Sequence, residues 1–469
     1  MARSCGTCRD RRILCDRATP SCAQCARSNR VCKGYGIRLS WPKTNNAKRA
    51  VVGAPLRGRR GARQLLSSSL VNVSDFDIKM HYYLSNSLPL DASALSLTVP
   101  IPFTILEVTD TDAQLFAYFE STASRSLAIL GRDPVSLGHT LLRMALANTS
   151  ASSQAVRYAI LALSSLHRYE LQEQCFTLKI SAIKALNEAT HAEIGPAEAL
   201  QHVAAGMLLC SFEIHKASCT SSQWLCFVTG VKQVLNASCW LRFRHDATFG
   251  VMIDWVYYHE VMSRFSLLHW GPAACLNNDP PSAVCAGGYQ VLPTPTNKLL
   301  RLFKTACYLL TINKDLPACI GHLQTLYGEI QSLPLSDSNH TSNPDLTLFH
   351  LATLIYLNRI TSSLLLLPDF QTESQITTAF ALLKRLKTCP RQFPLFIIGC
   401  EARTDEQRCV VLDLIERTER SASSRSTFIV NALVNRVWVQ DDLAGERGVP
   451  YRDKVDAVVS VCSLLPTFV

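Results

Sequence analysis

The 469-residue sequence has no run of eighteen apolar residues, so it predicts no helix that spans a membrane. Its first residues, MARSCGTCRDRR, lack the apolar segment of a secretory signal peptide. This absence argues against a secreted domain held by disulfides, although six cysteines occur within residues 5–32. We therefore expect a soluble protein whose cysteines are reduced.

Signature motifs of the common enzyme classes are also missing. We find no G-x-S-x-G elbow, no G-x-G-x-x-G after a strand, no phosphate-binding loop and no H-E-x-x-H among the twelve histidines. The pair His259 and Glu260 lies in a helical pattern beside aromatic residues, where a packed helix face is the commoner explanation. The sequence therefore predicts that the protein is not an enzyme.

The chain is rich, by contrast, in closely spaced cysteines near its N-terminus. Two C-x-x-C-x6-C units follow one another with an offset of 17 residues, and their members are Cys5, Cys8, Cys15, Cys22, Cys25 and Cys32. Each unit supplies three thiolates, whereas a closed structural zinc site takes four. Six thiolates can satisfy two zinc ions only if two thiolates bridge both metals. The symmetry of the duplication selects Cys5 and Cys22 as the bridges, so we expect two structural zinc ions.

This stretch resembles the fungal binuclear zinc cluster, the six-cysteine DNA-binding module of fungal transcription regulators. The resemblance covers about the first 35 residues and extends beyond the cysteines to Arg9, Asp16 and Pro20. One position departs from the family pattern, because the residue before the third cysteine is commonly lysine and is Leu14 here. One cationic contact that the resemblance would imply is therefore missing.

The arginines between the cysteines suggest how such a module would bind DNA. The residues between Cys8 and Cys15 have room for about two helical turns, so we expect a short, metal-anchored helix that enters a major groove. Arginine matches guanine O6 and N7 and also reaches phosphates. The resemblance implies CGG-type target triplets and assigns roles to four side chains: Arg12 as main base reader, Arg11 beside it, and Arg9 and Arg17 near phosphates.

Positive charge is concentrated at the same end of the chain. Residues 1–63 contain sixteen Lys and Arg against two Asp, a net charge of +14. The remaining residues contain 31 basic and 35 acidic side chains, a net charge of −4. Because a solvated surface normally mixes both signs, this excess favours a polyanion such as double-stranded DNA as the partner.

Residues 36–70 predict a flexible basic linker, since glycines and prolines interrupt every periodic pattern there. Its basic runs suit nuclear import signals or contacts to the DNA backbone. No heptad of apolar residues is present, so a coiled coil is not predicted, while a homodimer formed in another way stays open.

Residues 71–469 predict a large, all-helical domain, which makes the fold mainly α. Apolar residues recur at helical spacing over residues 152–170, 172–190, 194–215 and 221–236, with short breaks that favour packed antiparallel helices. From about residue 75 to 460 the chain also resembles, diffusely, the helical regulatory domain that accompanies the zinc cluster in many fungal transcription factors. The thirteen cysteines outside residues 1–35 are expected to be mostly buried free thiols.

Together these features predict a fungal-type, sequence-specific regulator of RNA polymerase II genes. We expect it to lie in the nucleus and to have DNA and the transcription machinery or co-regulators as partners, with no membrane association. Two alternatives remain at this point: a zinc-stabilised nuclear adaptor that binds proteins instead of specific DNA, and a helical enzyme with a DNA-targeting arm. Binding to CGG-containing duplexes would distinguish the regulator from the adaptor, and a pocket of converging polar groups would favour the enzyme.

Overall fold

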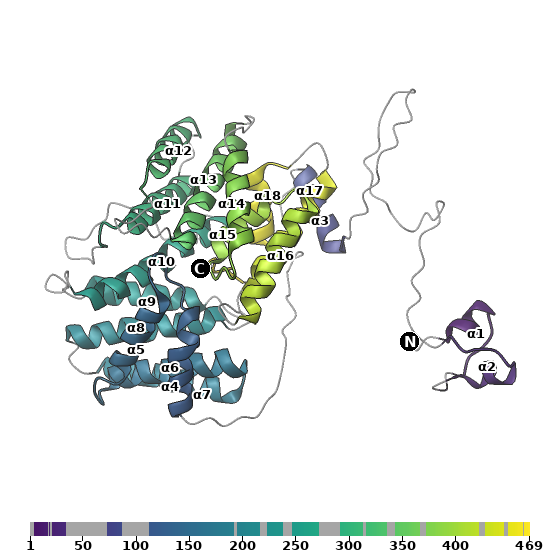
Figure 1. Ribbon diagram of the computed structural model, residues 1–469, viewed down its shortest axis with the longest axis horizontal. Coiled ribbons are helices and arrows are strands. Elements are labelled where there is room, and N and C mark those ends of the chain that lie inside the picture. The colour runs from purple at the N-terminus through teal and green to yellow at the C-terminus, as the bar shows by residue number, and fades with distance from the viewer. Residues whose placement is uncertain are drawn as a thin grey trace. The chain divides into compact units, whose positions relative to one another are not determined.

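The structure, a computed structural model, describes residues 4–16, 18, 21–33, 73–86, 112–191, 195–215, 223–237, 246–271, 291–312, 316–334, 343–365, 372–421, 427–444, 449–462 and 464–469. The chain forms two units, Met1–Ser68 and Ser69–Val469. Helices dominate both units and no strand occurs in the described ranges, which confirms the mainly α prediction (Figure 1). The predicted linker, residues 36–70, lies outside the described residues.

The N-terminal unit contains two short helices, α1 (Gly6–Asp10) and α2 (Ala23–Arg27). The second unit is a helical body. Its elements are α3 (Asp75–Asn86), α4 (Asp112–Ser121), η1 (Ala123–Ser126), α5 (Pro134–Ala145), α6 (Ala151–Tyr169), α7 (Glu173–Ala189), α8 (Pro196–His215), α9 (Gln223–Ala237), α10 (Ala247–Trp270), α11 (Pro295–Ile312), α12 (Leu316–Gln331), α13 (Pro344–Leu365), α14 (Thr372–Arg385), α15 (Gln392–Cys400), α16 (Asp405–Arg420), α17 (Thr427–Ala444) and α18 (Tyr451–Ser460). No described helix has both the length and the apolar character needed to cross a bilayer.

The four helices predicted from apolar periodicity are present as α6, α7, α8 and α9, with ends within two residues of the prediction. The Ser150 hydroxyl caps α6 by accepting the backbone N–H of Ser153, and Glu170, with φ of 64°, ends the helix in the left-handed region. A connection of only three residues then leads into α7, which packs along α6. Such short connections force neighbouring helices to run antiparallel.

The helical body has two hydrophobic cores that meet along α10. The helices from α4 to α9 build one core, and α11 to α18 build most of the other, on opposite sides of α10 in Figure 1. Residues of α10 up to Val256 belong to the first core and residues from Tyr257 onward to the second. Because α10 is covered from both sides, it is apolar around nearly its whole circumference.

The last residues of the chain are part of the second core. Phe468 and Val469 are almost fully buried, and their carbonyls accept the backbone N–H groups of Phe393 (3.1 Å) and Gln392 (3.4 Å) at the start of α15. The Trp224 indole also donates to the carbonyl of Leu465 at 3.2 Å. These bonds tie α9, α15 and the C-terminal segment into one packed unit.

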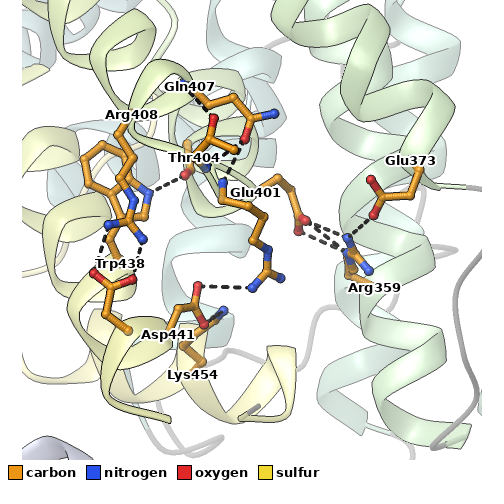
Figure 2. A network of polar contacts seen from close by, with 12 residues as sticks. Arg359, Glu373, Glu401, Thr404, Gln407, Arg408, Trp438, Asp441 and Lys454 are labelled. Carbon is orange, nitrogen blue, oxygen red and sulfur yellow. Dashed lines mark hydrogen bonds and ion pairs between the residues drawn. The ribbon is translucent and has the colours of Figure 1, made fainter. Parts of the chain in front are cut away.

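Charged side chains inside the body are held in ion pairs. Figure 2 shows Arg359 between the buried Glu401 and the exposed Glu373, and Lys454 beside Asp441. The buried carboxylates with their basic partners are Asp77 with Arg436, Glu213 with Lys179, Asp254 with Arg132, Glu260 with Lys232 and Lys304, and Glu401 with Arg359. Pairing of this kind offsets the cost of removing a charge from water.

The His259 and Glu260 pair belongs to a packed face of α10, as the sequence predicts. His259 is fully buried and its Nδ1 donates to the Trp255 carbonyl at 3.0 Å. Burial would raise the pKa of Glu260, but Lys304 and Lys232, each 2.9 Å away, outweigh it and lower the pKa to about 2. Glu260 therefore stays ionised and joins α10 to α9 and α11.

His259 makes the stability of the body depend on pH. Burial lowers its pKa from 6.5 to about 4, opposed by its bond to the Trp255 carbonyl, while the charges of Arg391 and His215 lower it further. The unfolded chain therefore takes up a proton near pH 6.5 that the folded chain refuses until about pH 4. We expect acidification across this window to cost up to about 3 kcal/mol of unfolding free energy. Urea unfolding at several pH values should show a shallower dependence for His259→Gln, but not for the exposed control His139→Gln. Equal slopes for wild type and His259→Gln would contradict this.

Candidate metal centre and nucleic-acid interface

The N-terminal unit is a structural duplication as well as a sequence duplication. The helices α1 and α2 are offset by 17 residues, like the cysteines. In each half the third residue of the C-x-x-C motif donates its backbone N–H to the sulfur of the first: Cys8 to Cys5 at 3.3 Å, and Cys25 to Cys22 at 3.4 Å. The sulfurs of Cys5 and Cys22 thus occupy equivalent positions, each at the turn that begins a helix.

The six sulfurs gather in two groups of four, within each of which all sulfurs lie within 4.8 Å of one another. One group contains Cys5, Cys8, Cys15 and Cys22, and the other contains Cys5, Cys22, Cys25 and Cys32. Cys5 and Cys22 belong to both groups and are fully buried. The arrangement has the connectivity that two metals sharing two thiolates would require.

The distances between sulfurs fit zinc better than disulfides. Sulfurs at 2.3 Å from a tetrahedral zinc ion lie about 3.8 Å apart. The sulfur of Cys5 lies 3.5 Å from that of Cys22 and 3.7 Å from that of Cys25, and the sulfur of Cys8 lies 3.6 Å from that of Cys22. A disulfide would need about 2.05 Å, and all six cysteines are free thiols. The residues therefore fit a thiolate-bound metal.

Burial also makes these thiols depend on a cation. It raises the pKa of both Cys8 and Cys22, because a thiolate in a dry site has lost its solvation. Thiolates are the form that binds zinc, so metal binding has to displace protons here. The ion supplies the positive charge that this small interior otherwise lacks.

The helix predicted between Cys8 and Cys15 is placed incorrectly by the sequence reasoning. The helix α1 begins at Gly6, before Cys8, and ends at Asp10. Arg12 follows with φ of 56°, in the left-handed region, and the Ile13 N–H turns back to the Cys8 carbonyl at 3.1 Å. The chain has to reverse early because Cys15 must return to the cluster, where its sulfur accepts the Cys5 N–H at 3.4 Å. Arg11 and Arg12 therefore lie in a turn after the helix.

The predicted DNA-contacting arginines differ in their surroundings. The Arg11 Nη1 donates to the Ser28 hydroxyl at 3.0 Å, so the second half of the module positions it. Arg12 is exposed, and no hydrogen bond or ion pair joins it to any described residue. Arg9 lies on α1 but its side chain is outside the described residues, as is the whole of Arg17.

Three polar contacts, absent from the sequence reasoning, join the two halves. Lys33 forms an ion pair with Asp10 at 3.2 Å, and the Thr7 hydroxyl donates to the Val31 carbonyl at 2.9 Å. Asp16 accepts the backbone N–H groups of Ala23 (3.0 Å) and Gln24, and these bonds, the first above all, lower its pKa. An ionised Asp16 therefore caps α2. Its place directly after the third cysteine was the signal available in the sequence.

A cysteine-bound metal module on the same chain as a large helical body is the composition of a class of gene regulators, and comparisons with known proteins agree. Residues 3–42 match the fungal Zn(2)-Cys(6) binuclear cluster domain, and residues 114–305 and 309–462 match the fungal specific transcription factor domain. The chain therefore belongs to the fungal transcription factors that carry a zinc-binding, DNA-binding cluster and this helical domain, and these are not families of enzymes. The resemblance noted from the sequence is confirmed.

Two characterised relatives support this assignment to different extents. The chain is 41% identical over 371 residues to a protein named transcription factor iacI of Pestalotiopsis fici, covering 76% of this chain and 95% of that protein. Over 39 residues it is 49% identical to the arginine metabolism regulation protein II of Saccharomyces cerevisiae, covering 8% of this chain and 4% of that one. No solved structure matches the chain.

Proposed function

We propose that this protein is a nuclear, sequence-specific regulator of RNA polymerase II transcription whose N-terminal module binds CGG-type sites in the major groove. The observation that carries the proposal is the pair of four-sulfur groups that share Cys5 and Cys22, with an unengaged arginine, Arg12, on the adjoining turn. A relative of nearly full length is named a transcription factor, which supports the regulatory role.

In this proposal the module holds two zinc ions. Cys5 and Cys22 bridge them, Cys8 and Cys15 complete one site, and Cys25 and Cys32 complete the other. Zinc is structural here, because a module of about 35 residues cannot bury enough apolar surface to fold alone. The module, residues 1–35, would be joined by a basic linker, residues 36–70, to the regulatory body, residues 71–469, which would meet co-regulators.

The four arginines divide between reading and positioning. Arg12 is proposed as the main base reader, because its guanidinium has no partner in the described protein and is available to guanine O6 and N7. Arg11, fixed by Ser28, sits beside it, and Arg9 and Arg17 are proposed near phosphates. The net charge of +14 over residues 1–63 supplies the electrostatic part of binding.

Selection of bound duplexes from a random pool, using the full-length zinc-loaded protein, tests this function. Recovery of CGG triplets would support the regulator and would also give the number and spacing of half-sites. Gel shifts on CGG duplexes and scrambled duplexes at one salt concentration then compare specific and non-specific affinity. Equal affinity for both would contradict the proposal and favour the protein-binding adaptor.

Arg12→Ala tests the reading role directly. We expect the preference for CGG over scrambled duplexes to fall by about 1–3 kcal/mol, while the salt dependence of binding changes little. Alanine keeps the Cβ atom, so the backbone cost of the left-handed position is the same for both residues. The control Arg30→Ala, at an exposed site in the second half, should weaken binding to both duplexes alike. An unchanged preference in Arg12→Ala would show that another side chain reads the sequence.

A further inference from the structure

Arg391 departs from the rule that buried charges in this protein are paired. Each of the five buried carboxylates has a basic partner, and the other buried cation, Lys454, lies 2.6 Å from Asp441. Arg391 is only 3% exposed, and no acidic side chain of the described residues lies within ion-pair distance of it. An unpaired cation in a protein interior is costly enough to require an explanation.

The structure holds Arg391 firmly between the two cores. Arg391 precedes α15, and its Nη2 donates to the Ile129 carbonyl at 2.6 Å, although 262 residues separate them. The loop that carries Ile129 is fixed in turn by Gly131, with φ of 71°, and by an ion pair between Arg132 and Asp254 at 2.9 Å. The guanidinium therefore cannot easily leave for solvent.

Two further buried polar atoms near Arg391 lack partners. The Tyr258 hydroxyl, the His259 Nε2 and the Arg391 Nε have no hydrogen bond and no solvent contact. The rings of Tyr258 and His259 lie 5.7 Å apart, and Tyr258 is linked to the Arg391 segment through Phe349, whose ring lies 6.2 Å from Tyr258 and 4.9 Å from Phe393. The Arg391 charge acts on both α10 groups, since it lowers the pKa of Tyr258, against burial, and that of His259, together with burial.

The bonding state of each group defines what a ligand would have to offer. Arg391 Nε and the Tyr258 hydroxyl are donors that seek an acceptor, and a guanidinium pairs best with a carboxylate. His259 already donates through Nδ1 to the Trp255 carbonyl, so in the neutral ring Nε2 is an acceptor that seeks a donor. A ligand that matches all three groups therefore has an acidic group and a donor next to it.

We propose that Arg391, Tyr258 and His259 form a binding site for a small carboxylic acid that also carries a hydrogen-bond donor, as hydroxy acids and amino acids do. The carboxylate pairs with Arg391 and accepts the Tyr258 hydroxyl, and the hydroxyl or ammonium group donates to His259 Nε2. The site lies where α10 passes from one core to the other, a location that ligand sites in helical proteins favour. A ligand there would contact both halves of the helical body.

Thermal unfolding of the full-length zinc-loaded protein tests the site without DNA, so its outcome is independent of the proposed DNA binding. The probes are glycolate and glycine, with acetate as the matched acid without a donor and chloride as the control at equal ionic strength. We expect glycolate or glycine to raise Tm in a saturable way, acetate to do so with about tenfold lower affinity, and chloride not to do so. Absence of a saturable rise with either donor-bearing acid overturns the proposal.

Two variants separate binding from folding. Arg391→Met should abolish the rise in Tm, and without acid it should keep the wild-type Tm, because it removes an unpaired charge. Tyr258→Phe removes a hydroxyl that has no partner, so it should also fold normally while binding glycolate about tenfold more weakly. Should Arg391→Met fail to fold, Tyr258→Phe decides alone. A rise equal to that of wild type in either folded variant would overturn the assignment of these residues.

Discussion

Replacement of Cys22 by serine is expected to remove both zinc ions and all sequence-specific DNA binding. Cys22 belongs to both four-sulfur groups, so its loss leaves three thiolates for each metal. Zinc contributes about 10–16 kcal/mol to the folding of small metal-bound modules, which otherwise do not fold. Native mass spectrometry of the purified protein should show fewer than one zinc per chain, and gel shifts should show no preference for CGG duplexes. Cys5→Ser should behave in the same way.

Two controls give this experiment its discrimination. Cys32→Ser removes a ligand that only one group uses, so the group around Cys8 and Cys15 should keep its ion longer when a chelator is added. Cys226→Ser changes an exposed thiol on α9 and should retain both ions. Two zinc ions per chain in Cys22→Ser would refute the bridging assignment, and one ion or none in the wild-type chain would refute the two-metal cluster.

The metal centre was predictable because its information is local and repeated. A spacing of 17 residues relates all three cysteine pairs, so the sequence alone identifies the equivalent ligands. The placement of α1 was not predictable in the same way. Its end depends on the return of Cys15 to the cluster and on the left-handed turn at Arg12, and both are consequences of packing around the sulfurs. Local spacing measured the length of that segment correctly and not its conformation.

In the helical body, periodicity predicted the helices that have one apolar and one polar face. The helices α6 and α7 are of this kind, and their ends were predicted within one residue. Helix α10 and the short α15 are buried all round, so their apolar residues carry no face and no neighbour can be inferred. The burial of the C-terminal residues likewise arises from contacts to α15 that lie far away in the sequence.

The buried charges show the same limit more strongly. Glu401 and Arg359 are 42 residues apart, and Ile129 and Arg391 are 262 apart, so no window of sequence contains both members of either contact. A charged residue in a helical pattern is normally assigned to a solvated face. Only the packed structure distinguishes Glu401, which is fully buried, from Glu406, which is exposed five residues later.

Glu401→Ala is expected to lower the free energy of unfolding of the helical body by about 3–5 kcal/mol. Glu401 is fully buried and accepts bonds from both Nε and Nη2 of Arg359, the latter at 2.7 Å, so its loss leaves a largely buried guanidinium with only the exposed Glu373 nearby (Figure 2). Urea unfolding followed by circular dichroism measures the change.

The exposed pair of Lys384 and Glu406 is the matched control, because its separation is also 2.7 Å. Both side chains are more than half exposed, so Glu406→Ala should cost no more than about 1 kcal/mol. The double variant Arg359→Met with Glu401→Leu removes both charges and should recover most of the lost stability. A similar cost for Glu401→Ala and Glu406→Ala would mean that distance alone, and not burial, sets the strength of these pairs. It would also remove the reason for regarding Arg391, buried without a carboxylate, as an exception that calls for a ligand.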